Sequence, residues 1–157
     1  NFQDLKSSGA EGVFSLFLGV ILSFSLGALI AISFGYTDAI SITTIGAGAV
    51  TFVVGPITGS AIGAGSEVIA LSVAAGLVKS ILVMTMTPLV ARRIGLNNPK
   101  SAMVFGGLMG TNSGVAAGLA AVDPKLVPYG AMTATFYTAL GCLIVPSILF
   151  FIVNLFY

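Results

Sequence analysis

Two glycine- and hydroxyl-rich stretches hold most of the groups in this sequence that could bind a small solute or an ion. Both follow the pattern Gly-x-x-[Ser/Thr]-Gly-x-Ala-x-Gly, the first from Gly55 to Gly63 and the second from Gly110 to Gly118, offset by 55 residues. Hydroxyl and backbone carbonyl oxygens are suitable ligands for an alkali cation, whereas free N–H groups at a helix start attract anions. The pattern therefore indicates an internal repeat with binding chemistry in each copy.

The glycines of the two stretches allow two interpretations. Their spacing of four residues is typical of membrane helices that pack closely against each other. Gly55-Pro56 and the run from Thr111 to Gly114 also supply residues that favour turns, as a broken helix or a re-entrant hairpin requires. The second interpretation predicts backbone groups exposed at the break, where they line a cavity.

Composition excludes most other kinds of protein. The chain has 157 residues, of which 57% are hydrophobic and 7% charged, whereas a soluble domain has roughly 25% charged residues. There is no His and only one Cys, Cys142, so His-based metal sites, His general bases and disulfides are excluded. We predict that the protein is not an enzyme, needs no cofactor and binds lipid rather than nucleic acid. The polar start of the chain argues against a signal peptide, and the missing initial Met suggests a fragment, a processed chain or an engineered sequence.

Three apolar stretches are long enough to cross a membrane. They are residues 13–34, 68–91 and 131–157, and Lys79 is the one charged residue inside them. At 1.5 Å per residue each exceeds the roughly 30 Å hydrocarbon core. Two further apolar segments, residues 41–66 and 101–122, contain the glycine-rich stretches. The expected fold is an all-α, multi-span membrane protein with broken or re-entrant helices, forming one domain over residues 1–157.

The distribution of loop charges discriminates between hairpins and full crossings. If both interrupted segments enter and leave on one side, five cations share one face and Asp38 and Glu67 lie on the other; the five are Lys6, Arg92, Arg93, Lys100 and Lys125. Full crossings would divide those cations between the two faces. The positive-inside rule favours hairpins. With one crossing per repeat, the two repeats have inverted topology.

The hairpin interpretation assigns a set of binding residues. We expect the returning helices to begin near Ser60 and Val115, so that the N–H groups of each tip hold one carboxylate of an anionic solute. The oxygens beside these tips suit a coupling cation. The predicted solute-binding residues are Thr58, Gly59, Ser60, Lys79, Gly110, Thr111, Asn112, Ser113 and Gly114. The predicted sodium ligands are Thr58, Thr111, Asn112 and Ser113.

Lys79 lies near the centre of its span, where a charge costs at least about 2.5–3.5 kcal/mol and should face protein or water. Ser72, Ala75 and Gly76 form a small, slightly polar stripe on the same helical face. One interpretation is a functional cation that attracts the anion or pairs with a carboxylate. The alternative is a lysine that snorkels to the interface, with no part in binding.

Three segments are similar to the M subunit of the bacterial malonate/sodium symporter. The first runs from Thr43 to Thr51 and continues from Val54 to Gly59, the second runs from Ile94 to Thr111, and the third runs from Leu126 to Phe136. The similarity extends from about Phe34 to Phe151 and corresponds to the C-terminal portion of that subunit.

The resemblance implies a two-component secondary transporter that takes up malonate, or a similar small dicarboxylate, together with sodium ions. It also implies a smaller L subunit as a partner and a location in the bacterial inner membrane. Two other functions are compatible with the residues alone. One is an anion channel or passive pore, which would show uncoupled, non-saturating flux. The other is a non-transporting scaffold subunit, in which the glycines only pack helices.

Overall fold

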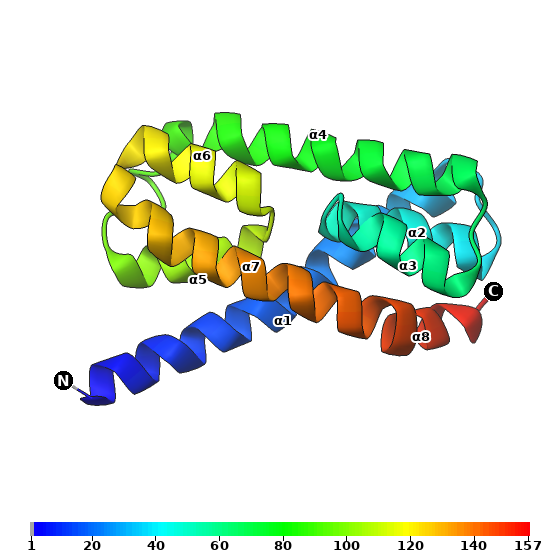
Figure 1. Cartoon of the computed structure of the whole chain (residues 1–157), viewed down its shortest axis with the longest axis horizontal. Coiled ribbons are helices and arrows are strands. Elements are labelled where there is room, and N and C mark those ends of the chain that lie inside the picture. Colours follow the sequence, from blue (N-terminus) through cyan, green and yellow to red (C-terminus); the bar gives the residue numbers. More distant parts are fainter. Residues whose placement is uncertain (1) are drawn as a thin grey trace. The chain divides into compact units, whose positions relative to one another are not determined.

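The chain is helical throughout the part that the structure describes. The computed structural model describes the backbone of residues 2–157 and the side chains of residues 9–157. No β-strand occurs among these residues (Figure 1). The helices are α1 (Phe2–Ser33), α2 (Ala39–Val50), α3 (Val54–Ile62), α4 (Ser66–Val90), α5 (Pro99–Met109), α6 (Asn112–Val122), a 3₁₀ turn (Pro124–Leu126), α7 (Val127–Ile144), a π-helical turn (Val145–Leu149) and α8 (Phe150–Asn154).

Three helical segments are long and apolar enough to cross a membrane, which confirms the predicted spans. They are Gly9–Ser33 in α1, Ser66–Val90 in α4 and Pro124–Asn154, which includes α7 and α8. The predicted boundaries agree to within a few residues, except that the third span begins seven residues earlier than expected. It does so because the 3₁₀ turn that starts at Pro124 leads directly into α7.

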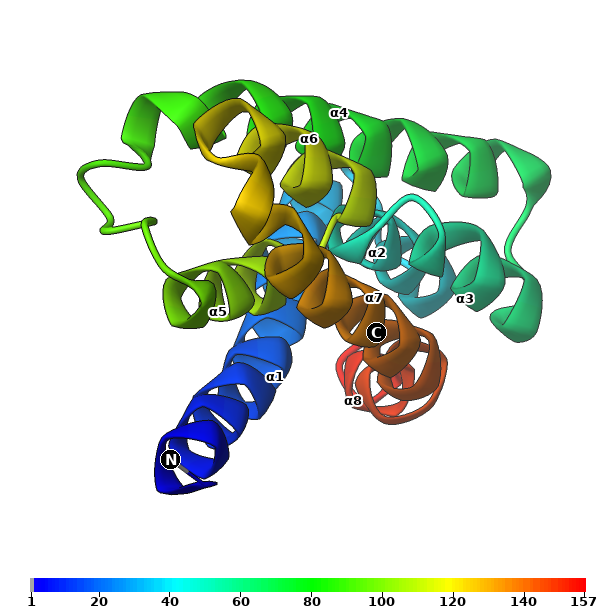
Figure 2. The ribbon, with the colours of Figure 1, turned by 60° about the vertical axis from the view of Figure 1, so that its left-hand side comes forward.

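Each of the two glycine-rich segments forms a pair of short helices joined by a tight break. In the first, α2 and α3 pack side by side; in the second, α5 and α6 diverge from the break and contact each other far less (Figure 1). This arrangement confirms the prediction of broken helices. The glycines also allow close approach, because a Cβ at Gly48 would overlap Ser72 in α4 and one at Gly107 would overlap Ser15 in α1. Figure 2 shows α5 beside this part of α1.

The position of the first break differs from the prediction. We expected the returning helix to start near Ser60, but α3 starts at Val54 and Ser60 lies in its last turn. Gly55 and Gly59 lie inside α3 and serve packing, since a Cβ at Gly59 would be 2.7 Å from Ile69 and 2.9 Å from Thr44. The chain turns instead at residues 51–53. The second break is closer to expectation, because α6 starts at Asn112, three residues before Val115.

The chain divides into two compact units. The α5–α6 unit comprises residues 1–19 and 80–137, and the α2–α3 unit comprises residues 20–79 and 138–157. Each unit therefore contains one broken segment and parts of the long helices. The α5–α6 unit has a continuous apolar core of Val83, Ala91, Leu96, Ala102, Phe105, Val115, Leu119, Leu126 and Ala134.

Local structure repeats at an interval of 60 residues rather than the 55 suggested by the glycine pattern. Asp38 caps the start of α2 by accepting a hydrogen bond from the Ser41 N–H, at 2.8 Å. Asn98 caps α5 in the same way through the Ser101 N–H, at 3.0 Å. Asp and Asn are common at helix starts, because their short side chains accept a hydrogen bond from an N–H group of the first turn.

Further features recur at the same interval. The turns before these caps place Gly35 at φ +93° and Gly95 at φ +68°, where residues with a Cβ are strained. Thr51 directly follows α2 at the first break, and Thr111 directly precedes α6 at the second. These features favour a repeat interval of 60 residues, and the glycine pattern is out of register with it, because Gly55 lies within α3 while Gly110 ends α5.

Candidate functional site

The break between α5 and α6 depends on Gly110. This residue ends α5 in a left-handed conformation, with φ +69°, and a Cβ there would overlap the ring of Tyr137 in α7. Tyr137 is fully buried and donates a hydrogen bond to the Gly19 carbonyl of α1, at 3.3 Å. The ring therefore supports the turn from behind, and α6 begins two residues later at Asn112.

A hydroxyl cluster holds this break against α4. The Ser80 Oγ lies 2.5 Å from the Thr111 Oγ1 and 2.8 Å from the Ser113 Oγ. Gly114 permits the approach, because a Cβ there would lie 2.6 Å from the Ser80 carbonyl oxygen. Thr111 and Ser80 are buried, whereas Ser113 is exposed. Ser80 was missed by the sequence analysis, since a single serine in an apolar span carries no signal that it meets a hairpin.

Asn112 presents an exposed amide at the same break. Its Nδ2 donates to the Thr135 Oγ1 of α7, at 2.7 Å, and Thr135 in turn donates to the Ala131 carbonyl, at 2.9 Å. An amide nitrogen has two N–H donors, so one remains for a ligand. Because the Thr111 side chain does not cap α6, the start of this helix also has backbone N–H groups available. Exposed donors at a helix start suit a carboxylate.

The break between α2 and α3 has a different character. The Thr51 Oγ1 accepts hydrogen bonds from the N–H groups of Val53 and Val54, at 3.2 and 3.0 Å. The Gly55 N–H donates to the Thr51 carbonyl at 3.2 Å, and Pro56 has no N–H. The first turn of α3 is therefore already satisfied. The expectation that N–H groups near Ser60 form an anion-binding helix start is wrong, because Ser60 lies at the opposite end of α3.

Lys79 lies at the α2–α3 break. Its Nζ donates to the carbonyl of Val50, the last residue of α2, at 2.9 Å and to the Ser23 Oγ of α1 at 3.0 Å. A cation at a helix C-terminus bonds its free carbonyls and complements the negative end of the helix dipole. Lys79 thus faces protein rather than snorkelling. These two hydrogen bonds join Lys79 to α1 and to the end of α2.

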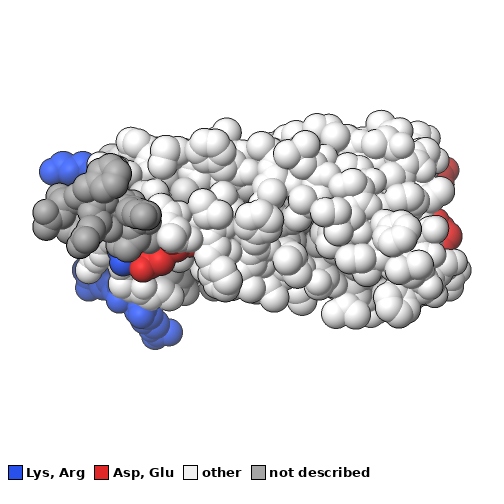
Figure 3. Space-filling model, turned by 90° about the horizontal axis from the view of Figure 1, so that it is seen from below, with Lys and Arg blue, Asp and Glu red and all other residues white. Residues whose placement is uncertain are grey.

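Two loop cations of the α5–α6 unit lie next to the ends of its short helices. Lys100 is the second residue of α5 and pairs with Glu11 at 3.0 Å, and Lys125 follows α6. A small pocket lined by Arg92 and Asp123 shows that the loop after α4 adjoins the end of α6. Figure 3 shows that charged side chains occupy only a small part of a largely uncharged surface. The side chain of Lys6 lies outside the described residues.

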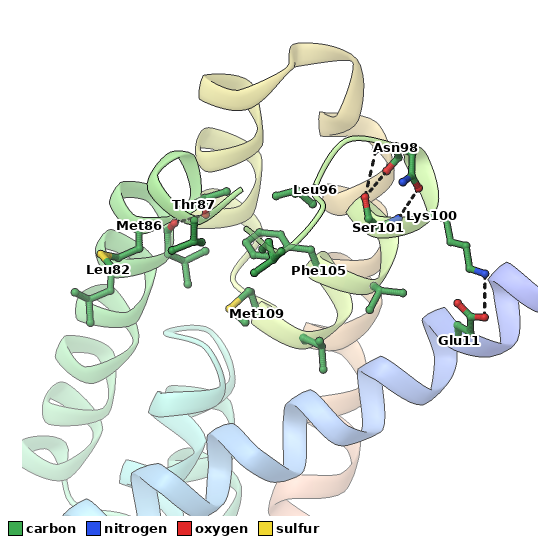
Figure 4. A pocket seen from close by; sticks show the side chains of 15 residues that line it. Glu11, Leu82, Met86, Thr87, Leu96, Asn98, Lys100, Ser101, Phe105 and Met109 are labelled. Carbon is green, nitrogen blue, oxygen red and sulfur yellow. Dashed lines mark hydrogen bonds and ion pairs between the residues drawn. The ribbon is translucent and has the colours of Figure 1, made fainter. Parts of the chain in front are cut away.

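A groove between α4 and α5 in this unit has a volume of about 740 Å³ (Figure 4). Its walls are mostly apolar, and include Leu82, Met86, Phe105 and Met109. Such a surface suits lipid or another apolar helix rather than a dicarboxylate. None of the predicted binding residues lines it.

The comparisons with known proteins yield one match. The family model described as "Malonate/sodium symporter MadM subunit" matches residues 1–157. No curated protein and no solved structure matches the chain. The match confirms the predicted resemblance and extends it to residues 1–33, which the sequence analysis placed by composition alone. It also confirms that the protein serves transport rather than catalysis.

Proposed function

Because this chain belongs to the family of the malonate/sodium symporter MadM subunit, we propose that the α5–α6 break holds a carboxylate of malonate. The chain is a membrane-embedded subunit of a transporter that couples malonate uptake to sodium, and it is not an enzyme. The observation that supports the proposed site is the uncapped start of α6 with the exposed Asn112 amide beside it.

Each residue of the break has a proposed role. Asn112 and the N–H groups of the first α6 turn donate to the carboxylate, and Ser113 adds an exposed hydroxyl. Gly110 forms the turn and Gly114 lets α6 reach α4, so both act by allowing the backbone to approach. Thr111, Asn112 and Ser113 also present oxygens to sodium, while Thr111 is anchored through Ser80.

Binding of malonate by the purified protein tests this site. A hydrogen bond to a charged group contributes about 1.5–3 kcal/mol, so Asn112→Ala should weaken binding by roughly 10-fold or more. Calorimetric titration at saturating sodium measures the effect, and the thermal unfolding of the variant should change little, because Asn112 is exposed and loses only its surface hydrogen bond to Thr135. Equal affinities of wild type and variant would contradict the assignment.

We further propose that α2–α3 and α5–α6 are re-entrant hairpins in repeats of inverted membrane topology. Each repeat then contains one hairpin and one crossing, and the cations Arg92, Arg93, Lys100 and Lys125 face the cytoplasm. The resemblance adds a bacterial inner-membrane location and a smaller L subunit as partner. The support for the hairpins is the tight break within each segment and the contact between its two limbs.

Single-cysteine labelling in intact cells tests this topology. Cys142 is the one cysteine of the sequence and is first replaced by Ala. Arg93→Cys and Lys125→Cys should both be protected from a membrane-impermeant reagent added outside, while Glu67→Cys should react, since Glu67 is exposed in the first turn of α4. Reaction of Lys125→Cys but not of Arg93→Cys would mean that α5 and α6 together cross the membrane.

A further inference from the structure

Two buried hydroxyls in the α2–α3 unit have no hydrogen-bond partner. The side chains of Thr43 and Thr58 are fully buried, and neither Oγ1 forms a hydrogen bond to any described residue. Other buried hydroxyls of this unit are satisfied; for example, the Thr44 Oγ1 donates to the Ile40 carbonyl at 2.7 Å. Burying a polar group without a partner is costly, so each such oxygen requires an explanation.

The two hydroxyls lie on one face of the α2–α3 pair. Val50 and Val54 both contact the last span at Gly141, where a Cβ would be 3.0 Å from each side chain. Thr43 precedes Val50 by two helical turns and Thr58 follows Val54 by about one turn, so both point toward the last span.

The register of the two helices brings the two hydroxyls to nearly the same level. Gly48 lies opposite Gly55, and Thr44 lies opposite Gly59. Antiparallel pairing in this register places Thr58 level with the residue after Thr44. Thr43 and Thr58 are then offset by two residues along the axis, or about 3 Å.

The last span supplies an additional oxygen next to this face. Its π-helical turn, Val145–Leu149, contacts both α2 and α3 and contains Pro146. Because Pro146 has no N–H, one backbone carbonyl in the turn before it lacks its usual helical donor. Single π-turns within α-helices are frequent at functional sites.

We propose that Thr43, Thr58 and a carbonyl of the turn before Pro146 bind a monovalent cation, sodium, within the α2–α3 unit. Neutral hydroxyl and carbonyl oxygens suit an alkali ion, whereas magnesium and calcium sites in proteins are built around carboxylates. No cluster of acidic, His or Cys ligands occurs among the described residues. The proposal rests on the sodium coupling of the family and gives the α2–α3 unit its own part in it.

Valine substitutions test the site with a matched control. Valine keeps the shape of threonine and removes only the hydroxyl, so Thr43→Val and Thr58→Val should fold and melt no lower than wild type without sodium. Thr44→Val is the control, since Thr44 is equally buried but bonds its own helix. Two quantities are measured on the purified protein: the sodium-induced rise in melting temperature without malonate, and the sodium concentration that half-saturates malonate binding.

The expected result is a specific loss of sodium response. Thr43→Val and Thr58→Val should reduce the sodium-induced shift in melting temperature to the part that sodium at the α5–α6 break contributes, and raise the half-saturating sodium concentration at least about tenfold, as loss of a metal-site partner does. Thr44→Val should behave like wild type. A sodium response in Thr43→Val and Thr58→Val equal to that of wild type would overturn the proposal and leave the hydroxyls to a buried water. Malonate binding at saturating sodium reports separately on the α5–α6 break, so failure of one proposal is distinguishable from failure of the other.

Discussion

Gly114→Val should weaken malonate binding by roughly 10- to 150-fold. A Cβ at this position would lie 2.6 Å from the Ser80 carbonyl oxygen and 2.9 Å from the Thr111 side chain, so α6 has to move away from α4. That movement breaks the hydrogen bonds of Ser80 with Thr111 and Ser113. A hydrogen bond to a charged group is worth about 1.5–3 kcal/mol, so the loss of one donor to the carboxylate weakens malonate binding by roughly 10- to 150-fold.

A neighbouring position on the same helix supplies the control for this substitution. Ala117→Val introduces a β-branched side chain three residues further along α6, but Ala117 is exposed. It should leave the affinity for malonate close to that of wild type. Overpacking at Gly114 is also expected to cost about 1–3 kcal/mol of stability. Equal affinities of the two variants would mean that the approach of α6 to Ser80 has no part in binding.

Lys79→Met should destabilise the α2–α3 break. The substitution leaves the Val50 carbonyl at the end of α2 without its ammonium donor. A hydrogen bond to a charged group is worth about 1.5–3 kcal/mol, so unfolding should occur at a lower temperature, with a loss of transport. Ser23→Ala is the control, because it removes the hydrogen bond between Lys79 and the Ser23 hydroxyl and keeps the bond to Val50.

Thermal unfolding in detergent and malonate affinity together identify what Lys79 does. A fall in both quantities supports the capping role seen in the structure. Unchanged thermal stability in Lys79→Met would contradict that role. If affinity alone then fell, Lys79 would instead act on the anion directly, as a functional cation in the span.

The long apolar runs were the most predictable part of this fold. Their length and lack of charge are sufficient to identify a membrane span, and the structure has helices at all three. The existence of two breaks was also predictable, because glycine, hydroxyl and proline residues interrupt otherwise apolar segments. Composition could not decide whether these glycines allow helices to pack closely or form a break in a helix, since glycine does both.

The first break was misplaced for this reason. Gly55 and Gly59 carry the strongest local signal, yet they lie within α3 and allow it to pack on α2 and α4. The turn is formed by Thr51, whose hydroxyl satisfies two N–H groups. The helix caps at Asp38 and Asn98 lie 60 residues apart and indicate the correct register of the repeat. In that register Thr51 and Thr111 are equivalent positions.

Contacts between distant segments were not predictable at all. Ser80 belongs to the site only because α6 approaches α4 at Gly114, and the sequence does not specify which helices meet. The same holds for the bond between Lys79 and the end of α2. Lys79 is unusual in the sequence because of its depth in the span, but its partner at the end of α2 emerges only from the fold.

Binding of malonate across a sodium titration, for wild type and Asn112→Asp, tests the proposed site most directly. The substitution removes the hydrogen bond to Thr135 but places a negative charge at the start of α6, where the helix dipole stabilises it and offsets that loss. The same charge competes with the carboxylate for the donors of the α6 start. We predict that sodium tightens malonate binding by wild type, by linkage, and that Asn112→Asp binds roughly 10- to 150-fold more weakly at every sodium concentration. Equal affinity of the two proteins throughout the titration would contradict a carboxylate site at the α5–α6 break.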